Sequence, residues 1–136
     1  MLDSLVPALH AVSTWFMLGV IWFVQGVHYP LMAASAGSRT SAYAREHQRR
    51  TAYVVLVPML TELSTCVWLT LGPWRQSATA WAGLTLLGIA WASTFFLQLP
   101  AHRQLAHEFN PRVHRKLVRS NWLRTIAWTV RGILLL

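Results

Sequence analysis

The sequence has few acidic residues and a single cysteine. Its 136 residues contain 4 Asp and Glu against 12 Lys and Arg, and charged residues make up only 12% of the chain. This share is about half of the usual one, too small to cover the surface of an ordinary soluble domain. The one cysteine, Cys66, excludes an internal disulfide and a cysteine-based zinc site. Hydrophobic residues make up 54%, which excludes a disordered chain.

The net charge of +8 is high enough to suggest a nucleic-acid partner, but the positions of the charges argue against one. Residues 4–38 carry no formal charge, and neither do residues 76–102. A nucleic-acid-binding domain has no reason to separate its charges by intervals as long as a bilayer is thick. We therefore expect membrane lipids, and no nucleic acid, as partners.

Four apolar segments are long enough to cross a membrane as helices, because a span needs about 20 residues. They cover residues 5–28, 51–71, 78–99 and 118–136. The sequence therefore predicts an all-α, integral membrane four-helix bundle that forms one domain over residues 1–136.

A faint internal repeat relates the first two spans to the last two. Gly19-Val20-Ile21-Trp22 resembles Gly88-Ile89-Ala90-Trp91, and His28-Tyr29-Pro30 resembles Gln98-Leu99-Pro100 in the same order. This predicts two similar helical hairpins, the parallel kind of membrane repeat.

Basic residues predict the orientation in the membrane. Residues 30–50 have four Arg against one Glu, and residues 100–121 have four Arg and one Lys against one Glu. The other side has only Asp3 and Arg75. We therefore predict a multi-pass protein of the bacterial inner (cytoplasmic) membrane with both termini outside. The second and fourth helices extend into the cytoplasm in this prediction.

Charges within a bilayer are costly, so they usually face the interior of a bundle and mark function. Glu62 lies near the middle of its span, and its natural partner in the fourth span is either Arg131 or Arg124. His10 lies on the same, outer half of the first span. Two readings stay open for these residues: a structural ion pair between helices, or a charged track of a small proton-coupled transporter.

A second polar zone is predicted near the cytoplasmic face. Helical spacing places His114, Asn121 and Arg124 on one face of the fourth helix, and His28 and His47 approach the same level. We expect His47, His114, Asn121 and Arg124 as catalytic residues. Histidines from separate helices are also candidate ligands for a metal ion or a haem. The candidates are His28, His47 and His114 for a metal, and these three with His102 for a cofactor.

The arrangement resembles small, uncharacterised four-helix proteins of the bacterial inner membrane. The residues that carry this resemblance are His28-Tyr29-Pro30, Glu46-His47-Gln48-Arg49-Arg50, Leu99-Pro100-Ala101-His102 and Asn121-Trp122-Leu123-Arg124-Thr125. In size and topology the chain is also similar to the anthrone-oxygenase-like membrane proteins. That second resemblance implies oxidation of a lipophilic aromatic molecule and transfers no catalytic residue.

Three functions stay open from these residues. The first is a membrane oxidoreductase that acts on a lipophilic small molecule, with the histidines, Asn121 and Arg124 at its site. The second is a non-catalytic subunit of a larger membrane complex. The third is a small proton-coupled carrier, which we expect to be a homodimer.

Overall fold

The computed structural model describes residues 2–34 and 40–136, so the predicted cytoplasmic Arg39 lies outside it. The described residues form four long helical rods and no strands. The elements are α1 (Leu2–Phe23), η1 (Val24–His28), α2 (Tyr29–Ala34), α3 (Thr40–Leu71), α4 (Ala78–Ser93), η2 (Thr94–Gln98), α5 (Leu99–His107) and α6 (Pro111–Leu134). The first rod runs continuously from α1 through η1 to α2, and the third from α4 through η2 to α5. The prediction of an all-α four-helix chain is confirmed.

The first and third rods each contain one π-helical turn, η1 and η2, at corresponding places. In η1 the Tyr29 N–H donates to the carbonyl of Val24, five residues back, and in η2 the Leu99 N–H donates to that of Thr94. Pro30 and Pro100 follow directly. Proline has no N–H, and its ring clashes with the carbonyl four residues before it, so the helix widens by one residue there.

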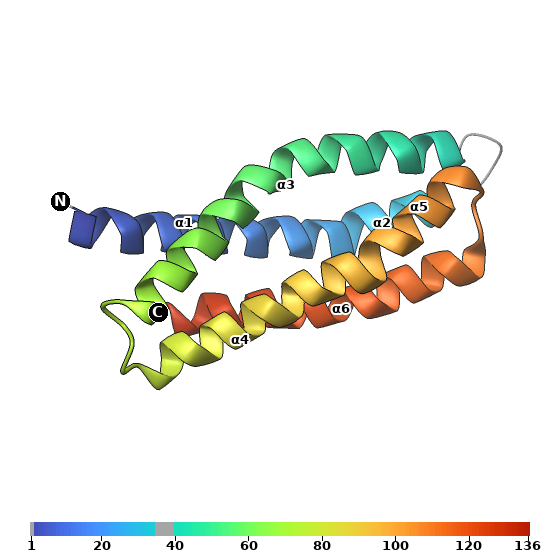
Figure 1. Ribbon diagram of the computed structural model, residues 1–136. Coiled ribbons are helices and arrows are strands. Elements are labelled where there is room, and N and C mark those ends of the chain that lie inside the picture. The colour runs from blue at the N-terminus through green and yellow to red at the C-terminus, as the bar shows by residue number, and fades with distance from the viewer. Residues whose placement is uncertain (1, 35–39) are drawn as a thin grey trace.

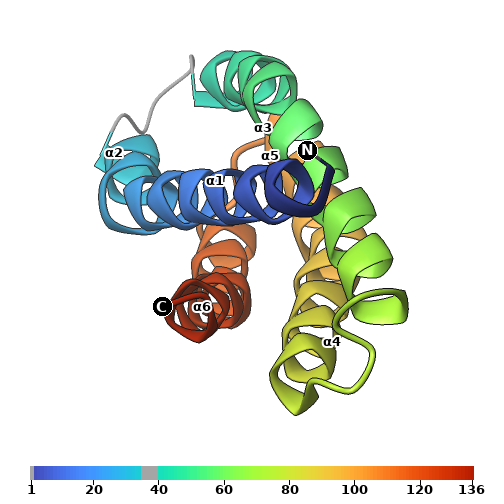
Figure 2. The ribbon, with the colours of Figure 1, turned by 90° about the vertical axis from the view of Figure 1, so that its left-hand side faces the viewer.

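The four rods run alternately up and down, so the hairpins close at opposite ends (Figure 1). The turn between α3 and α4 lies at the same end as both termini, whereas the turn between α5 and α6 lies at the other end (Figure 1). Figure 2, viewed from the terminal end, shows α1 between α3 and α6. The rod α3 bends along its length (Figure 1), and Pro58, which removes a backbone hydrogen bond, lies inside it.

The hydrophobic core follows the bundle axis in two clusters. Trp128 of α6 and Met17 of α1 are at the centre of the cluster nearer the termini, and Leu117 and Met32 are in the other. The outer faces are apolar as well: Phe96 is 78% exposed and Val57 is 69% exposed. So many large apolar side chains on the outside would be unfavourable in water.

Three of the four rods are long and apolar enough to cross a membrane: Ser4–Ala34, Thr40–Leu71 and Ala78–His107. The predicted fourth span is present as part of α6, but this helix is not among the three. Arg119, Arg124 and Arg131 interrupt its apolar sequence. Its residues therefore do not mark it as a span by composition alone.

Candidate functional site

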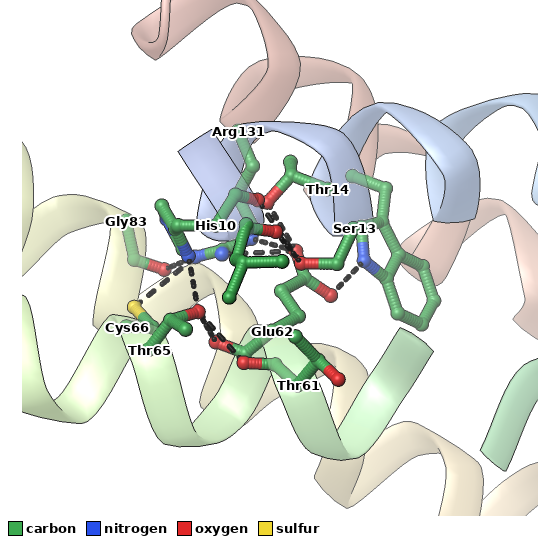
Figure 3. Close-up of polar contacts among 11 residues, drawn as sticks. His10, Ser13, Thr14, Thr61, Glu62, Thr65, Cys66, Gly83 and Arg131 are labelled. Carbon is green, nitrogen blue, oxygen red and sulfur yellow. Dashed lines mark hydrogen bonds and ion pairs between the residues drawn. The ribbon is translucent and has the colours of Figure 1, made fainter. Parts of the chain in front are cut away.

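The interior contains two groups of polar residues, one in each half of the bundle. The group nearer the termini is centred on Glu62, whose carboxylate is completely buried (Figure 3). Arg131 donates to Glu62 Oε1 from Nη2 at 2.9 Å and from Nε at 3.1 Å. Thr14 donates to the same oxygen at 2.8 Å, and Trp128 Nε1 donates to Oε2 at 2.9 Å. We call these four residues the Glu62 cluster.

The Glu62 cluster connects all four rods. Thr14 comes from α1, Glu62 from α3, and Trp128 and Arg131 from α6, while Arg131 Nη1 also donates to the carbonyl of Gly83 in α4 (Figure 3). The predicted pairing of Glu62 with Arg131 is therefore confirmed. Because the carboxylate oxygens accept hydrogen bonds from both α1 and α6, this arrangement supports a structural ion pair over a transport track.

A cavity of about 290 Å³ lies between the Glu62 cluster and the end of the bundle that carries the termini. His10, Cys66 and Arg131 are among its lining residues, together with Trp74 of the α3–α4 turn. His10 Nδ1 lies 3.1 Å from the hydroxyl of Thr65, which donates in turn to the carbonyl of Thr61 at 2.7 Å (Figure 3). The predicted proximity of His10 to Glu62 and Arg131 is thus confirmed, although His10 is held by Thr65.

The second polar group contains three of the predicted histidines. The rings of His28 and His47 stack, with centroids 3.5 Å apart and planes 18° from parallel. The ring of His102 lies 5.9 Å from that of His47. Two tyrosines complete this histidine cluster: the Tyr43 hydroxyl is 3.2 Å from His28 Nδ1, and the Tyr29 hydroxyl is 3.2 Å from His102 Nε2.

Two ring nitrogens of the histidine cluster have no hydrogen-bond partner among the described residues. They are His28 Nε2 and His102 Nδ1, and both are buried. Buried polar atoms in proteins are usually hydrogen-bonded, so these two nitrogens are available to a polar group that enters the cluster.

His114 packs edge-on against the ring of Tyr29, with the two ring centroids 6.3 Å apart. Its Nε2 is 3.0 Å from the backbone carbonyl of Tyr29, so this nitrogen fastens α6 to α2. Burial lowers the pKa of His114, because the charged ring is desolvated, while the Tyr29 carbonyl raises it less. We therefore assign His114 a structural contact, in place of the catalytic and metal-ligating roles expected from the sequence.

Asn121 and Arg124 form a further buried network beside the first π-turn. Asn121 Nδ2 donates to Gln25 Oε1 at 2.8 Å, and Arg124 Nη1 donates to Asn121 Oδ1 at 3.1 Å. The Arg124 guanidinium lies over the ring of Trp128, 5.2 Å from its centroid. No carboxylate of the described residues forms an ion pair with Arg124. The Asn121 side chain is completely buried, and both its amide nitrogen and its amide oxygen form hydrogen bonds. This favours a structural role for Asn121.

The predicted metal site lacks the necessary geometry. The described residues contain no group of three or more His, Cys, Asp or Glu side chains placed to hold a metal ion. His28 and His47 meet face to face, although a metal is bound by the edge nitrogens, and His114 is directed at a backbone carbonyl. The three residues therefore do not fit a shared metal, and the expected haem has no support from these positions either.

A groove between α1 and α3 leads to the histidine cluster. It has a volume of about 550 Å³ and is walled mainly by apolar side chains. Its polar residues lie together toward one end: His28, His47, Arg50 and Thr51. The apolar residues of the groove are Trp15, Phe16, Gly19, Val20, Phe23, Val24 and Val54.

Several residues of these networks were not among the predicted site residues. Gln25 and Gln98 lie in the two π-turns, and both reach α6: Gln98 Nε2 donates to Ser120 Oγ at 2.9 Å. Gln25 lies five residues before Pro30 and Gln98 lies two residues before Pro100, so the sequence repeat does not align them and gave no signal for their shared role. Tyr29 and Tyr43 were not predicted as site residues either, because nothing in a sequence shows that their hydroxyls meet histidines.

Comparison with protein-family models, with curated proteins and with solved structures found no match to this chain. The resemblance to small inner-membrane proteins and to anthrone-oxygenase-like proteins therefore stays a prediction.

Proposed function

We propose that this chain is an integral membrane protein that binds a lipophilic molecule with an anionic head group in the groove between α1 and α3. The observation that carries the proposal is the polarity of this groove. Aromatic and aliphatic side chains line most of it, and His28, His47 and Arg50 lie together at one end. A molecule with a long apolar chain and a carboxylate head has the same polarity.

Membrane placement is supported by the three apolar rods and by the exposed apolar side chains around the bundle. The two basic regions, residues 40–50 and 103–119, lie at the end opposite the termini. Basic residues favour the cytoplasmic side. We therefore assign this end to the cytoplasm and the termini and the α3–α4 turn to the outside, as in a bacterial inner membrane.

Arg50 and the two stacked histidines would hold the head group. Among the described residues, Arg50 is the one formally charged residue that lines the groove, and Glu46 accepts from its Nε at 2.6 Å. A neutral imidazole can accept a proton from a bound molecule, and the imidazolium so formed can return it, which suits acid–base chemistry on that molecule. His28 and His47 are the catalytic candidates that the groove supports. The proposal contains no redox step, because the predicted metal and haem ligands do not converge.

The orientation predicts which exposed residues a membrane-impermeant reagent reaches. In a Cys66→Ser background, Gln76→Cys in the α3–α4 turn and Gln104→Cys in α5 place single thiols at opposite ends. We expect a membrane-impermeant maleimide to label Gln76→Cys in intact cells and Gln104→Cys only after permeabilisation. Both glutamines are exposed, so they form a matched pair. Equal labelling of both in intact cells would contradict the membrane placement.

The groove itself is tested at Gly19, which lies on its wall. A Cβ at Gly19 would have nothing within 4 Å, so the backbone there accepts a side chain, and Gly19→Leu places that side chain at the wall of the groove. We expect this variant to bind a dansyl-labelled long-chain carboxylate at least about tenfold more weakly, which corresponds to ~1.4 kcal/mol. The measurement is the fluorescence of the probe titrated with the detergent-solubilised protein.

Gly88→Leu is the matched control for Gly19→Leu. Gly88 occupies the corresponding place of the sequence repeat in α4, is exposed, and a Cβ there also meets nothing within 4 Å. It does not line the groove. We expect probe affinity like that of the wild type. The proposal is wrong if both leucine variants bind the probe alike.

A further inference from the structure

One exposed face of α6 changes from basic to apolar along its length. The exposed basic residues of its first turns are Arg112, Arg115, Lys116 and Arg119, which we call the basic stripe. The same face continues with the exposed residues Trp122, Leu123, Ile126, Val130 and Ile133, which we call the apolar stripe. The steps of three and four residues place both stripes on one side of the helix. The opposite side is buried in the bundle, through Leu117, Asn121 and Trp128.

The basic stripe has no carboxylate partner in the described part of the chain. The ion pairs there belong to Glu46 and Glu62, on α3. The four basic residues and Ser120 line a shallow hollow of about 510 Å³. Four cations around one hollow repel one another, so an anion in it would lower the energy of this surface.

The start of α6 adds to this positive potential. Asn110 caps the helix by accepting from the N–H of Arg112 at 2.8 Å, and the first turn contains no acidic residue. The N-terminal end of a helix carries a partial positive charge, which disfavours cations nearby and favours anions. The sequence thus places one cation of the basic stripe, Arg112, in the first turn, where the helix itself prefers a negative group.

We propose that the basic stripe binds the phosphate of an anionic phospholipid whose acyl chains lie along the apolar stripe. The polarity of such a lipid, a charged head followed by two apolar chains, follows the same order as the two stripes. A free phosphate or a nucleic acid would use the basic stripe but leave the apolar stripe without a function. This proposal rests on the membrane placement proposed above, but not on the groove between α1 and α3.

The test is the retention of lipids by the purified, detergent-solubilised protein in native mass spectrometry. The protein is mixed with equal amounts of phosphatidylglycerol and phosphatidylcholine. We expect the wild type to retain the anionic lipid preferentially. In Arg115→Gln/Arg119→Gln this preference should fall by at least about tenfold, because each basic residue near a lipid surface contributes about fivefold.

Arg75→Gln/Arg103→Gln is the matched control, since it removes two exposed arginines that do not line the hollow. It should keep the preference of the wild type. Equal retention of both lipids by the wild type, or an equal loss in both double variants, would overturn the proposal. So would displacement of phosphatidylglycerol by inorganic phosphate, because the site would then recognise phosphate alone. Equal maleimide labelling of both cysteine variants in intact cells would contradict the membrane placement and, with it, the lipid site. Equal retention of the two lipids by a correctly inserted protein would contradict the lipid site alone.

Discussion

Replacing Arg131 by methionine should lower the free energy of unfolding by about 3–5 kcal/mol, because it leaves the buried Glu62 without its ion-pair partner. Both side chains are almost completely buried, at 2% and 0% exposure. Thr14 and Trp128 would still donate to the carboxylate, but neither carries a charge. The measurement is reversible unfolding of the purified protein in mixed micelles by titration with dodecyl sulfate.

Two further variants make the Arg131 result specific. In Glu62→Leu/Arg131→Met both charges are gone, so we expect this variant to be more stable than Arg131→Met alone. Glu46→Gln removes the carboxylate that forms ion pairs with Arg49 and Arg50 on α3, and these ion pairs are exposed to solvent. Its loss should leave the unfolding curve unchanged. If Arg131→Met unfolds like the wild type, the Glu62 cluster does not hold the rods together.

Replacing Asn121 by leucine should lower the free energy of unfolding by about 2–4 kcal/mol, because two buried polar groups lose their partner. The amide of Asn121 bridges Gln25 in the first π-turn and Arg124 in α6. Leucine has a similar size and makes no hydrogen bond, so Gln25 Oε1 and Arg124 Nη1 would be left unpaired. The same unfolding titration measures the loss.

Ser120→Ala is the control for Asn121→Leu, because Ser120 is adjacent in α6 and accepts from the other π-turn glutamine, Gln98. Ser120 is only partly buried, so its loss should lower stability by about 1 kcal/mol or less. If Asn121→Leu is as stable as the wild type but does not bind the dansyl-labelled carboxylate, the structural role is wrong and Asn121 takes part in ligand binding.

The two polar groups of the bundle have different consequences for function. Both carboxylate oxygens of Glu62 already accept hydrogen bonds from donors on α1 or α6. The Glu62 cluster therefore serves to hold helices together rather than to bind a substrate. The histidine cluster contains unpaired ring nitrogens and adjoins a groove. We therefore place the proposed chemistry there, and we regard the carrier function as the weaker alternative.

The number of long helices follows from the sequence alone. Residues 4–38 and 76–102 are free of formal charge and each is long enough to cross a bilayer as a helix, which satisfies its own backbone hydrogen bonds. A cationic partner for Glu62 in the fourth span was also predictable, but the sequence left Arg124 and Arg131 both open, and the structure selects Arg131. The repeated proline at 30 and 100 likewise indicates that the two halves are alike.

Only the tertiary structure decided which polar atoms meet. The periodicity of a helix gives the face of a residue but not the height or tilt of its neighbour, so it grouped His114 with His28 and His47. The structure gives them different contacts: His114 contacts the Tyr29 backbone, while His28 and His47 stack. The π-turns before Pro30 and Pro100 shift the register of two rods by one residue, which changes the side that each following side chain faces. That shift depends on packing as well as on proline, so it cannot be predicted from the 3.6-residue periodicity of an α-helix.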